Sequence, residues 1–332
     1  MSIKVSIIIP IYNVSDYVKR CMKSVMHQSY DNIECIVVDD CSPDDSIAKC
    51  EKMIADYHGP INFTILHHQC NRGLSAARNT GTDAATGDYI LYLDSDDELT
   101  SDCIEKLVRP LLNDPTIEMV MGGREDIPDG CPIPPYFKKN DISQELDLTS
   151  NEAVRQCYFD KNIYYVNAWN KLIKKSFLKR NQLYFMERLL WEDIMWTFFV
   201  MKHLCHLYIV PDVTYLHYMR PQSIVTSTSI EKREKHLIKI YSTIANNFTE
   251  GKQAQEAKYY YKKVCGRCIR NPKNQTVIQS AKLFRKALAE EHYSKEAFVL
   301  SVMLFLAKTV FGRVVFSIIV KRKELMDSQK MG

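Results

Sequence analysis

Short apolar runs alternate with helical patterns along the first third of the chain. The runs cover residues 5–9, 33–38, 63–66 and 89–93, and Pro10 closes the first of them. Runs of this length that end at turn residues are typical of buried strands. Because helical patterns separate them, the sequence predicts an α/β fold with a mainly parallel, doubly wound sheet. Ligands of such sheets bind at the carboxyl ends of the strands.

Acidic side chains gather directly after two of these predicted strands. Asp39 and Asp40 follow the second run, and Asp94, Asp96 and Asp97 follow the fourth. Because like charges repel, clustered carboxylates indicate a bound cation or a hydrogen-bonding ligand, and oxygen-rich sites suit Mg²⁺ or Mn²⁺. One such cluster is common in solvated loops, whereas two at equivalent strand ends are much stronger evidence. The pattern predicts a metal that neutralises a phosphate-bearing substrate.

Composition and missing motifs exclude several classes of protein. The 332 residues are 46% hydrophobic and 25% charged, which excludes a disordered chain. The eleven cysteines are an odd number without close pairing and the N-terminus lacks a secretory pattern, so we expect reduced thiols in the cytoplasm. No GxGxxG follows the first run and no GxxxxGK[ST] occurs, which removes the main support for dinucleotide and P-loop chemistry.

Five motifs carry a resemblance to a known family. They are VSIIIPIYN at 5–13, VVDDCS at 37–42, NRGLSAARNTG at 71–81, GDYILYLDSDD at 87–97 and the pair Glu192-Asp193. In this order and spacing the chain resembles the family-2 glycosyltransferases over roughly residues 1–225. The resemblance implies a GT-A fold and inverting transfer of a sugar from a nucleotide-diphosphate donor, usually UDP-linked.

The resemblance also implies a set of donor-binding residues. Pro10, Tyr12 and Asn13 would line the base pocket, and Asp40 would read the uracil ring. Arg78 would lie near the nucleotide, while Asp94 with its neighbour Ser95 would approach the ribose or the donor sugar. Where the family commonly has Gly after the second Asp of the first cluster, this chain has Cys41.

For the metal, the resemblance implies two ligands. Asp96 would coordinate the Mn²⁺ or Mg²⁺ ion that bridges the diphosphate, and His217, on a predicted strand over 213–219, would be a further ligand. The alternative for a lone strand histidine is a structural role. Arg220, just beyond that strand, has the planar geometry that suits phosphate.

An acceptor hydroxyl needs a base, since it is a poor nucleophile until its proton leaves. The resemblance assigns that role to Asp193, with Glu192 orienting the base or touching the acceptor. The alternative for both acids is charge complementarity at the start of a helix predicted over 192–203. Between the motifs, the Gly- and Pro-rich segment 122–147 predicts a loop over the site.

The charge of the chain is divided unequally. Residues 231–332 hold 21 Lys and Arg against 9 Asp and Glu, so the net charge of +4 conceals +12 there and −8 in residues 1–230. We therefore predict a catalytic domain over 1–230 and a basic helical extension over 231–332. Within it, residues 297–320 are apolar but interrupted by Lys308 and Arg313, which does not support a clean membrane span.

The basic extension predicts an anionic membrane surface as a partner, with its helices in the interface, whereas a buried helical hairpin is the alternative. Nucleic acid is not expected, since the segment has no recognition motif. The leading hypothesis is an inverting transferase at the inner face of the cell membrane that moves a hexose or amino-hexose from a UDP-sugar to a glycan or polyprenol-linked acceptor in surface polysaccharide synthesis. The alternatives are a sugar-phosphate nucleotidyltransferase and a non-catalytic, membrane-docked sugar-nucleotide binding module.

Overall fold

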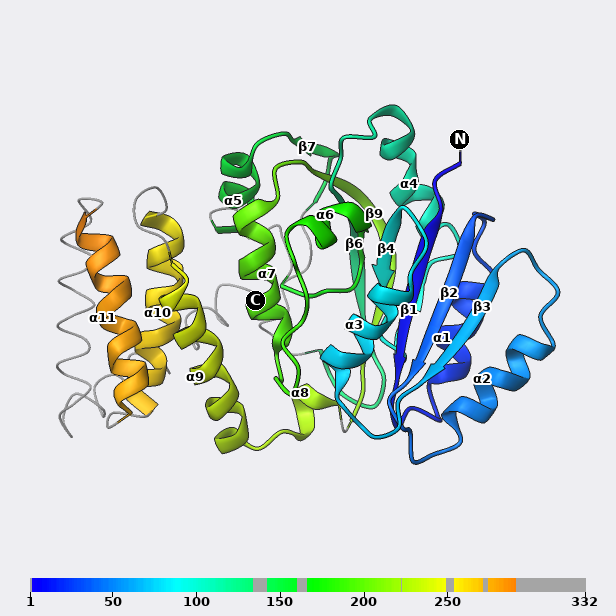
Figure 1. The fold of residues 1–332 in the computed structure, drawn as a ribbon, viewed down its shortest axis with the longest axis horizontal. Helices are drawn as coiled ribbons and strands as arrows, with labels where there is room; N and C mark the ends of the chain where they lie inside the picture. Colours follow the sequence, from blue (N-terminus) through cyan, green and yellow to red (C-terminus); the bar gives the residue numbers. More distant parts are fainter. Residues whose placement is uncertain are drawn as a thin grey trace. The chain divides into compact units, whose positions relative to one another are not determined.

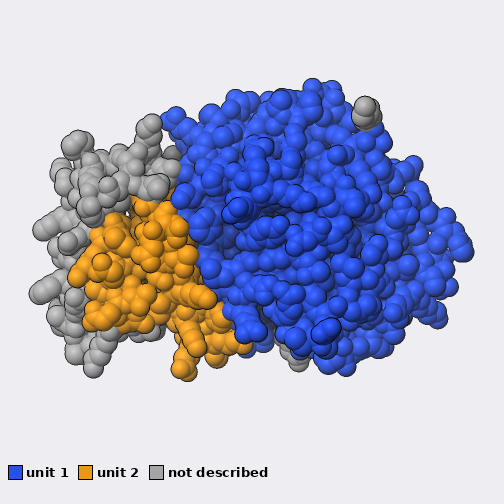
Figure 2. All heavy atoms as spheres, viewed as in Figure 1, with its two compact units in different colours: residues 1–227 blue, residues 228–332 orange. Residues whose placement is uncertain are grey.

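The computed structural model describes residues 2–133, 142–159, 166–221, 223–248, 254–270 and 274–290. The chain divides into two compact units, residues 1–227 and residues 228–332 (Figure 2). Their boundary falls close to the change in charge at residue 230.

A mixed sheet forms the centre of the first unit, with the strand order β3-β2-β1-β4-β8-β6-β9-β5 (Figure 1). Its parallel half consists of β1 (Val5–Ile11), β2 (Ile33–Asp39), β3 (Asn62–His67) and β4 (Tyr89–Tyr92). The other half consists of β8 (Lys171–Lys174), β6 (Met119–Pro128), β9 (Leu207–Met219) and the short strand β5 (Glu98–Leu99), and β7 (Leu146–Leu148) pairs with β9. Strand β8 runs antiparallel to both β4 and β6, whereas β6 and β9 are parallel.

Helices cover both faces of this sheet (Figure 1). Alternate residues of β1 point to opposite faces, so Ile7 and Ile9 join one core and Ile8 joins the other. Three helices contribute to the core of Ile7 and Ile9: α1 (Val18–Met26), α2 (Ser46–Ala55) and α4 (Cys103–Asn113). Four helices contribute to the core of Ile8 on the other face: α3 (Leu74–Ala84), α5 (Asn151–Phe159), α6 (Lys175–Arg180) and α7 (Glu192–His203). A one-turn helix, α8 (Ile224–Ser227), ends the unit. The doubly wound, mainly parallel sheet predicted from the sequence is confirmed.

One predicted loop is a strand instead. Residues 119–128 form β6, although the sequence predicted a loop from Gly122 onward. Gly122 lies so close to Thr214 of β9 that a Cβ atom would overlap the threonine side chain. The glycine therefore marks a close approach between two strands rather than a turn. Residues 134–141 of the predicted loop lie outside the described residues.

The second unit is helical where the structure describes it. It contains α9 (Ile230–Asn246), α10 (Ala254–Arg270) and α11 (Gln275–Glu290). Tyr241, Tyr260 and Phe284 contribute one ring each from the three helices to its buried core. Among the described helices, none combines the length and the apolar character needed to cross a membrane. The apolar stretch 297–320 lies outside the described residues.

Strand register brings the two acidic clusters to the same edge. Strand β1 lies between β2 and β4, with Ile11 beside Asp39 and Ile8 beside Tyr92. Because all three strands are parallel, residues 39–40 and 94–97 both follow carboxyl ends at one edge of the sheet, as predicted.

Candidate active site

Asp40 fixes the loop that leads into α3. Its carboxylate accepts hydrogen bonds from the backbone N–H groups of Arg72, at 2.8 Å, and Gly73, at 2.7 Å, and it lies 2.7 Å from Nδ1 of His68. Gly73 has a φ of +90°, which favours glycine. Asp40 is buried, so its contacts position the start of the helix, while the role of reading uracil stays a prediction.

The loops after β1 and β2 are tied together beside this turn. The backbone N–H of Asn13 donates to Oγ of Ser42 at 2.8 Å, and the adjacent Tyr12 ring is 47% exposed. Pro10, the third residue predicted for the base pocket, is buried within β1 beside Val38. The Tyr12 ring is therefore exposed at this edge of the sheet, as stacking on a planar ligand would require.

Cys41 occupies a backbone conformation that glycine adopts more easily. Its φ is +59°, in the left-handed region, which costs a residue with a side chain roughly 1–2 kcal/mol. Cys41, which stands where the family commonly has glycine, therefore adopts the left-handed conformation at some cost in strain.

Arg78 is the centre of the site. This side chain of α3 is buried, and its guanidinium binds three carboxylates: Asp94 after β4 at 2.7 Å, Glu192 at 2.7 Å and Asp193 at 3.1 Å. The role of Arg78 near the nucleotide stays a prediction, and its contacts in the structure join Asp94 to both predicted acids of α7. Ser95, next to Asp94, is buried.

Three carboxylates around one guanidinium leave an excess of negative charge in a buried place. The pKa of Glu192 is raised to about 8, first by burial and then by the charge of Asp193, while the charge of Arg78 opposes the shift. Burial also raises the pKa of Asp193, against the opposing charge of Arg78. The side chain of Glu192 is 6% exposed and that of Asp193 is 21% exposed. Asp193 is therefore the acid that a second reactant can reach, whereas Glu192 is closed off and its raised pKa favours the protonated form.

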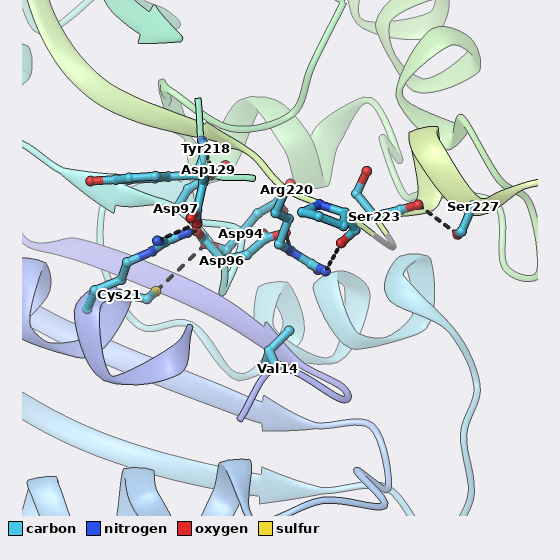
Figure 3. A network of polar contacts seen from close by, with 12 residues as sticks. Val14, Cys21, Asp94, Asp96, Asp97, Asp129, Tyr218, Arg220, Ser223 and Ser227 are labelled. Atoms are coloured by element: carbon cyan, nitrogen blue, oxygen red, sulfur yellow. Dashed lines mark hydrogen bonds and ion pairs between the residues drawn. The ribbon is translucent and has the colours of Figure 1, made fainter. Parts of the chain in front are cut away.

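Arg220 pairs with the cluster after β4 (Figure 3), whereas the Arg20 guanidinium pairs with Asp129. Arg220 donates from Nε to the Asp96 carboxylate at 2.6 Å, and Arg20 of α1 donates to the Asp96 carbonyl oxygen at 2.6 Å. The guanidinium of Arg20 also lies 3.7 Å from the ring centre of Tyr218. The predicted need for a cation is thus met in part by side chains of the protein itself.

Asp97 faces inward and supports this arrangement. It accepts hydrogen bonds from the hydroxyl of Tyr215 and the backbone N–H of Tyr218, both at 2.8 Å. Burial raises the pKa of Asp97 well above its ordinary value, and the charges of Asp96 and Asp94 raise it further. Asp97 therefore anchors β9 to the cluster and is not open to a ligand.

Comparison with known proteins identifies the family of the chain. A model of the family described as Glycosyl transferase family 2 matches residues 6–180. The chain belongs to glycosyltransferase family 2. As a member, the protein is an enzyme that transfers sugar, which sets aside the nucleotidyltransferase and the non-catalytic binding module.

A curated glycosyltransferase and two solved structures are similar over most of the chain. The uncharacterized glycosyltransferase EpsJ of Bacillus subtilis (strain 168) is 27% identical over 267 residues, which are 80% of this chain and 72% of EpsJ. The structure of S. aureus TarS 1–349 in complex with UDP-GlcNAc has a TM-score of 0.70 at 19% identity, over 94% of this chain and 90% of that one. The mannosyltransferase PcManGT of Pyrobaculum calidifontis, in complex with GDP-Man and Mn²⁺, has a TM-score of 0.55 at 17% identity, over 97% of this chain and 80% of that chain. At these identities the two structures establish the shared fold.

The predicted metal ligands of this family-2 glycosyltransferase differ in their surroundings. Within the described ranges, no three His, Cys, Asp or Glu side chains gather in a position to hold a metal ion. The Asp96 carboxylate still fits the oxygen chemistry of Mg²⁺ or Mn²⁺, since such ions take one or two carboxylates and complete their shell with substrate phosphates and water. His217 lies 2.7 Å through Nδ1 from Asp126, a carboxylate–histidine pair of the kind that supports metal ligands. Its role as a ligand stays a prediction.

Sequence reasoning missed several residues of the glycosyltransferase site. Lys171 on β8 is fully buried, and Arg20 contacts the Asp96 backbone. Lys171 is the first residue of the short strand Lys171–Lys174 and follows Asn170, so no apolar run marks it as buried, and nothing in the α1 pattern distinguishes Arg20 from a surface arginine. Trp169, beside Lys171, stacks on Tyr215 in the core, with ring centres 4.3 Å apart.

Proposed function

We propose that this glycosyltransferase moves a hexose or amino-hexose from a UDP-sugar to a hydroxyl of a glycan or lipid-linked acceptor, with inversion at the sugar carbon. The observation that carries the proposal is the position of Asp193. It is partly exposed at the start of α7, and Arg78 joins it to Asp94, which the family resemblance assigns to the donor sugar. A carboxylate so held can accept the proton of an acceptor hydroxyl next to the sugar carbon.

The reaction would be a single displacement. The acceptor oxygen attacks the anomeric carbon while Asp193 takes its proton, and the bond from that carbon to the UDP oxygen breaks. Arg78 keeps the base in place, and the raised pKa of Glu192 disfavours a second negative charge beside it. Asp96, with His217 as the predicted second ligand, would hold a Mn²⁺ or Mg²⁺ ion, which neutralises charge on a diphosphate leaving group. Arg220 and Arg20 place positive charge beside Asp96.

Uracil is the proposed base because the family resemblance implies a UDP-linked donor, and the exposed Tyr12 ring lies at the predicted base pocket beside the tied loops of residues 13 and 42. In support, the TarS complex contains UDP-GlcNAc. PcManGT, the weaker structural match, contains GDP-Man instead, so the nucleotide is the first property to test.

A thermal-shift screen of UDP-sugars and GDP-mannose, each with and without Mn²⁺, tests the donor. We expect one UDP-sugar with Mn²⁺ to raise the melting temperature most, because a ligand at 100 times its Kd stabilises the native state by about 2.7 kcal/mol. UMP and Mn²⁺ alone are the controls. A larger shift with GDP-mannose, or no nucleotide-dependent shift with Mn²⁺ present, would contradict the proposal.

We further propose that the basic extension holds the enzyme at an anionic membrane surface. There the enzyme would reach a polyprenol-linked acceptor and act in surface polysaccharide synthesis. The support is the +12 charge of residues 231–332 and the apolar stretch 297–320. Co-sedimentation with vesicles of phosphatidylglycerol and phosphatidylcholine should retain the full chain at 50 mM salt and release most of it at 500 mM. Equal binding to pure phosphatidylcholine vesicles would show that charge is not responsible, and no binding at low salt would exclude the membrane role.

A further inference from the structure

One arginine of α1 joins the turn after β4 to the ends of β6 and β9. The Arg20 guanidinium donates twice to the Asp96 carbonyl oxygen, from Nη2 at 2.6 Å and from Nε at 3.2 Å. Its third nitrogen, Nη1, lies 2.7 Å from the carboxylate of Asp129, directly after β6. The same group lies over the ring of Tyr218 on β9, 3.7 Å from the ring centre (Figure 3). Every nitrogen of the guanidinium thus has a partner, which fixes its orientation.

Helix α1 holds the backbone of this turn at two further points. The thiol of Cys21 donates to the Asp94 carbonyl at 3.7 Å, and Oγ of Ser24 accepts from the backbone N–H of Leu99 at 3.1 Å. Contacts of this kind with main-chain groups orient a turn, whereas neutralisation of its charge would need contacts with the carboxylates. Because the carbonyl and the side chain of Asp96 belong to one residue, a fixed carbonyl restricts where the carboxylate points.

The two predicted metal ligands lie on segments that this arginine joins. Asp96 belongs to the turn, and His217 lies near the end of β9. Asp129 strengthens the link to β9, since its backbone N–H donates to the carbonyl of Met219 at 3.0 Å. Contacts that orient metal ligands from behind affect the affinity for the ion. We propose that Arg20 is a positioning residue that fixes the turn of Asp96 relative to β9, which carries the other predicted ligand.

The competing explanation is charge alone, because Arg20 also brings a positive charge to a site proposed for a diphosphate. Lysine separates the two explanations. It keeps the charge, but its ammonium is a point donor that lacks the planar fork with which Arg20 reaches the carbonyl of Asp96 and the carboxylate of Asp129 together. A role in charge therefore survives Arg20→Lys, whereas a role in positioning does not.

The inference rests on the proposed binding of UDP with Mn²⁺, and its test needs no turnover. Calorimetric titration of UDP into the full chain, with and without saturating Mn²⁺, measures the gain in UDP affinity that the ion supplies. We expect both Arg20→Lys and Arg20→Met to reduce this gain by about tenfold, as is typical when a residue behind a metal ligand is changed. Without Mn²⁺, Arg20→Lys should bind UDP as the wild type does, since the charge is kept. Amide hydrogen exchange over residues 94–99 should be faster in both variants.

Lys19→Met is the matched control, because it removes one positive charge from an exposed position next to Arg20 and should leave both measurements unchanged. A wild-type gain that persists in Arg20→Met would overturn the inference and leave the proposed function intact. A gain that persists in Arg20→Lys but not in Arg20→Met would show that charge alone matters, which also overturns the inference. Absence of any gain in the wild type would instead contradict the proposed metal role, and the inference with it.

Discussion

Replacement of Arg78 by Met is expected to lower the free energy of unfolding by about 3–5 kcal/mol, because it leaves three carboxylates without the cation that they share. Burial alone would lower the pKa of Arg78, but Asp94, Asp193 and Glu192 together raise it, so the guanidinium stays charged in the core. Denaturant unfolding of the wild type and the variant, with linear extrapolation, measures the difference.

The loss should depend on pH. Without Arg78, the pKa values of Glu192 and Asp193 rise further above their values in the unfolded chain, so the folded variant binds more protons than the unfolded one. Stability of the variant therefore falls as pH rises, and the loss should be smaller at pH 5 than at pH 8. The matched control is Arg72→Met, since the exposed pair of Arg72 with Glu187 is worth about 0–1 kcal/mol. A loss at Arg78 no larger than at Arg72 would show that the cluster does not depend on the guanidinium.

Replacement of Asp193 by Asn should reduce kcat by roughly 10²–10⁴ and leave donor binding nearly unchanged. Asparagine keeps the shape of the side chain but cannot take the proton of the acceptor. Initial rates of UDP release, together with calorimetric titration of UDP and Mn²⁺, separate the two effects.

Glu192→Gln is the informative comparison for this variant. Because burial and the charge of Asp193 raise the pKa of Glu192, glutamine resembles the protonated form that this shift favours. We expect its kcat to stay within about tenfold of the wild type, since only the loss of the general base should cost roughly 10²–10⁴-fold. If Glu192→Gln is the more damaging of the two changes, the roles of the two acids must be exchanged.

Local patterns in the sequence predicted much of the fold. The run of residues 5–9 and the acidic pairs after two other strands are readable because strand period and turn residues act over a few positions. Strand β6 was missed because Gly122 looks like a turn residue until Thr214 is known to pack against it. Because Thr214 is far from Gly122 in the sequence, their contact leaves no local periodicity that would indicate the strand.

The candidate site was less predictable than the sheet. The family motifs indicate Arg78, Asp94 and Asp193 separately, but the contact of Arg78 with the α7 acids joins positions 114 and 115 residues apart. The position of Lys171 depends on how β8 enters the sheet antiparallel to β4 and β6, which no periodicity in the sequence specifies. The sequence therefore predicts which side chains can take part in the chemistry, and the fold determines which of them lie close enough to form ion pairs.

The most direct test of the account is the stereochemistry of the reaction. Proton NMR of the anomeric signal follows slow hydrolysis of the best-bound, α-linked UDP-sugar by wild-type enzyme with Mn²⁺, before the free sugar equilibrates. Single displacement assisted by Asp193 predicts that the β-anomer appears first, and that its formation is lost in Asp193→Asn. Initial formation of the α-anomer, or equal rates in the wild type and the variant, would contradict it.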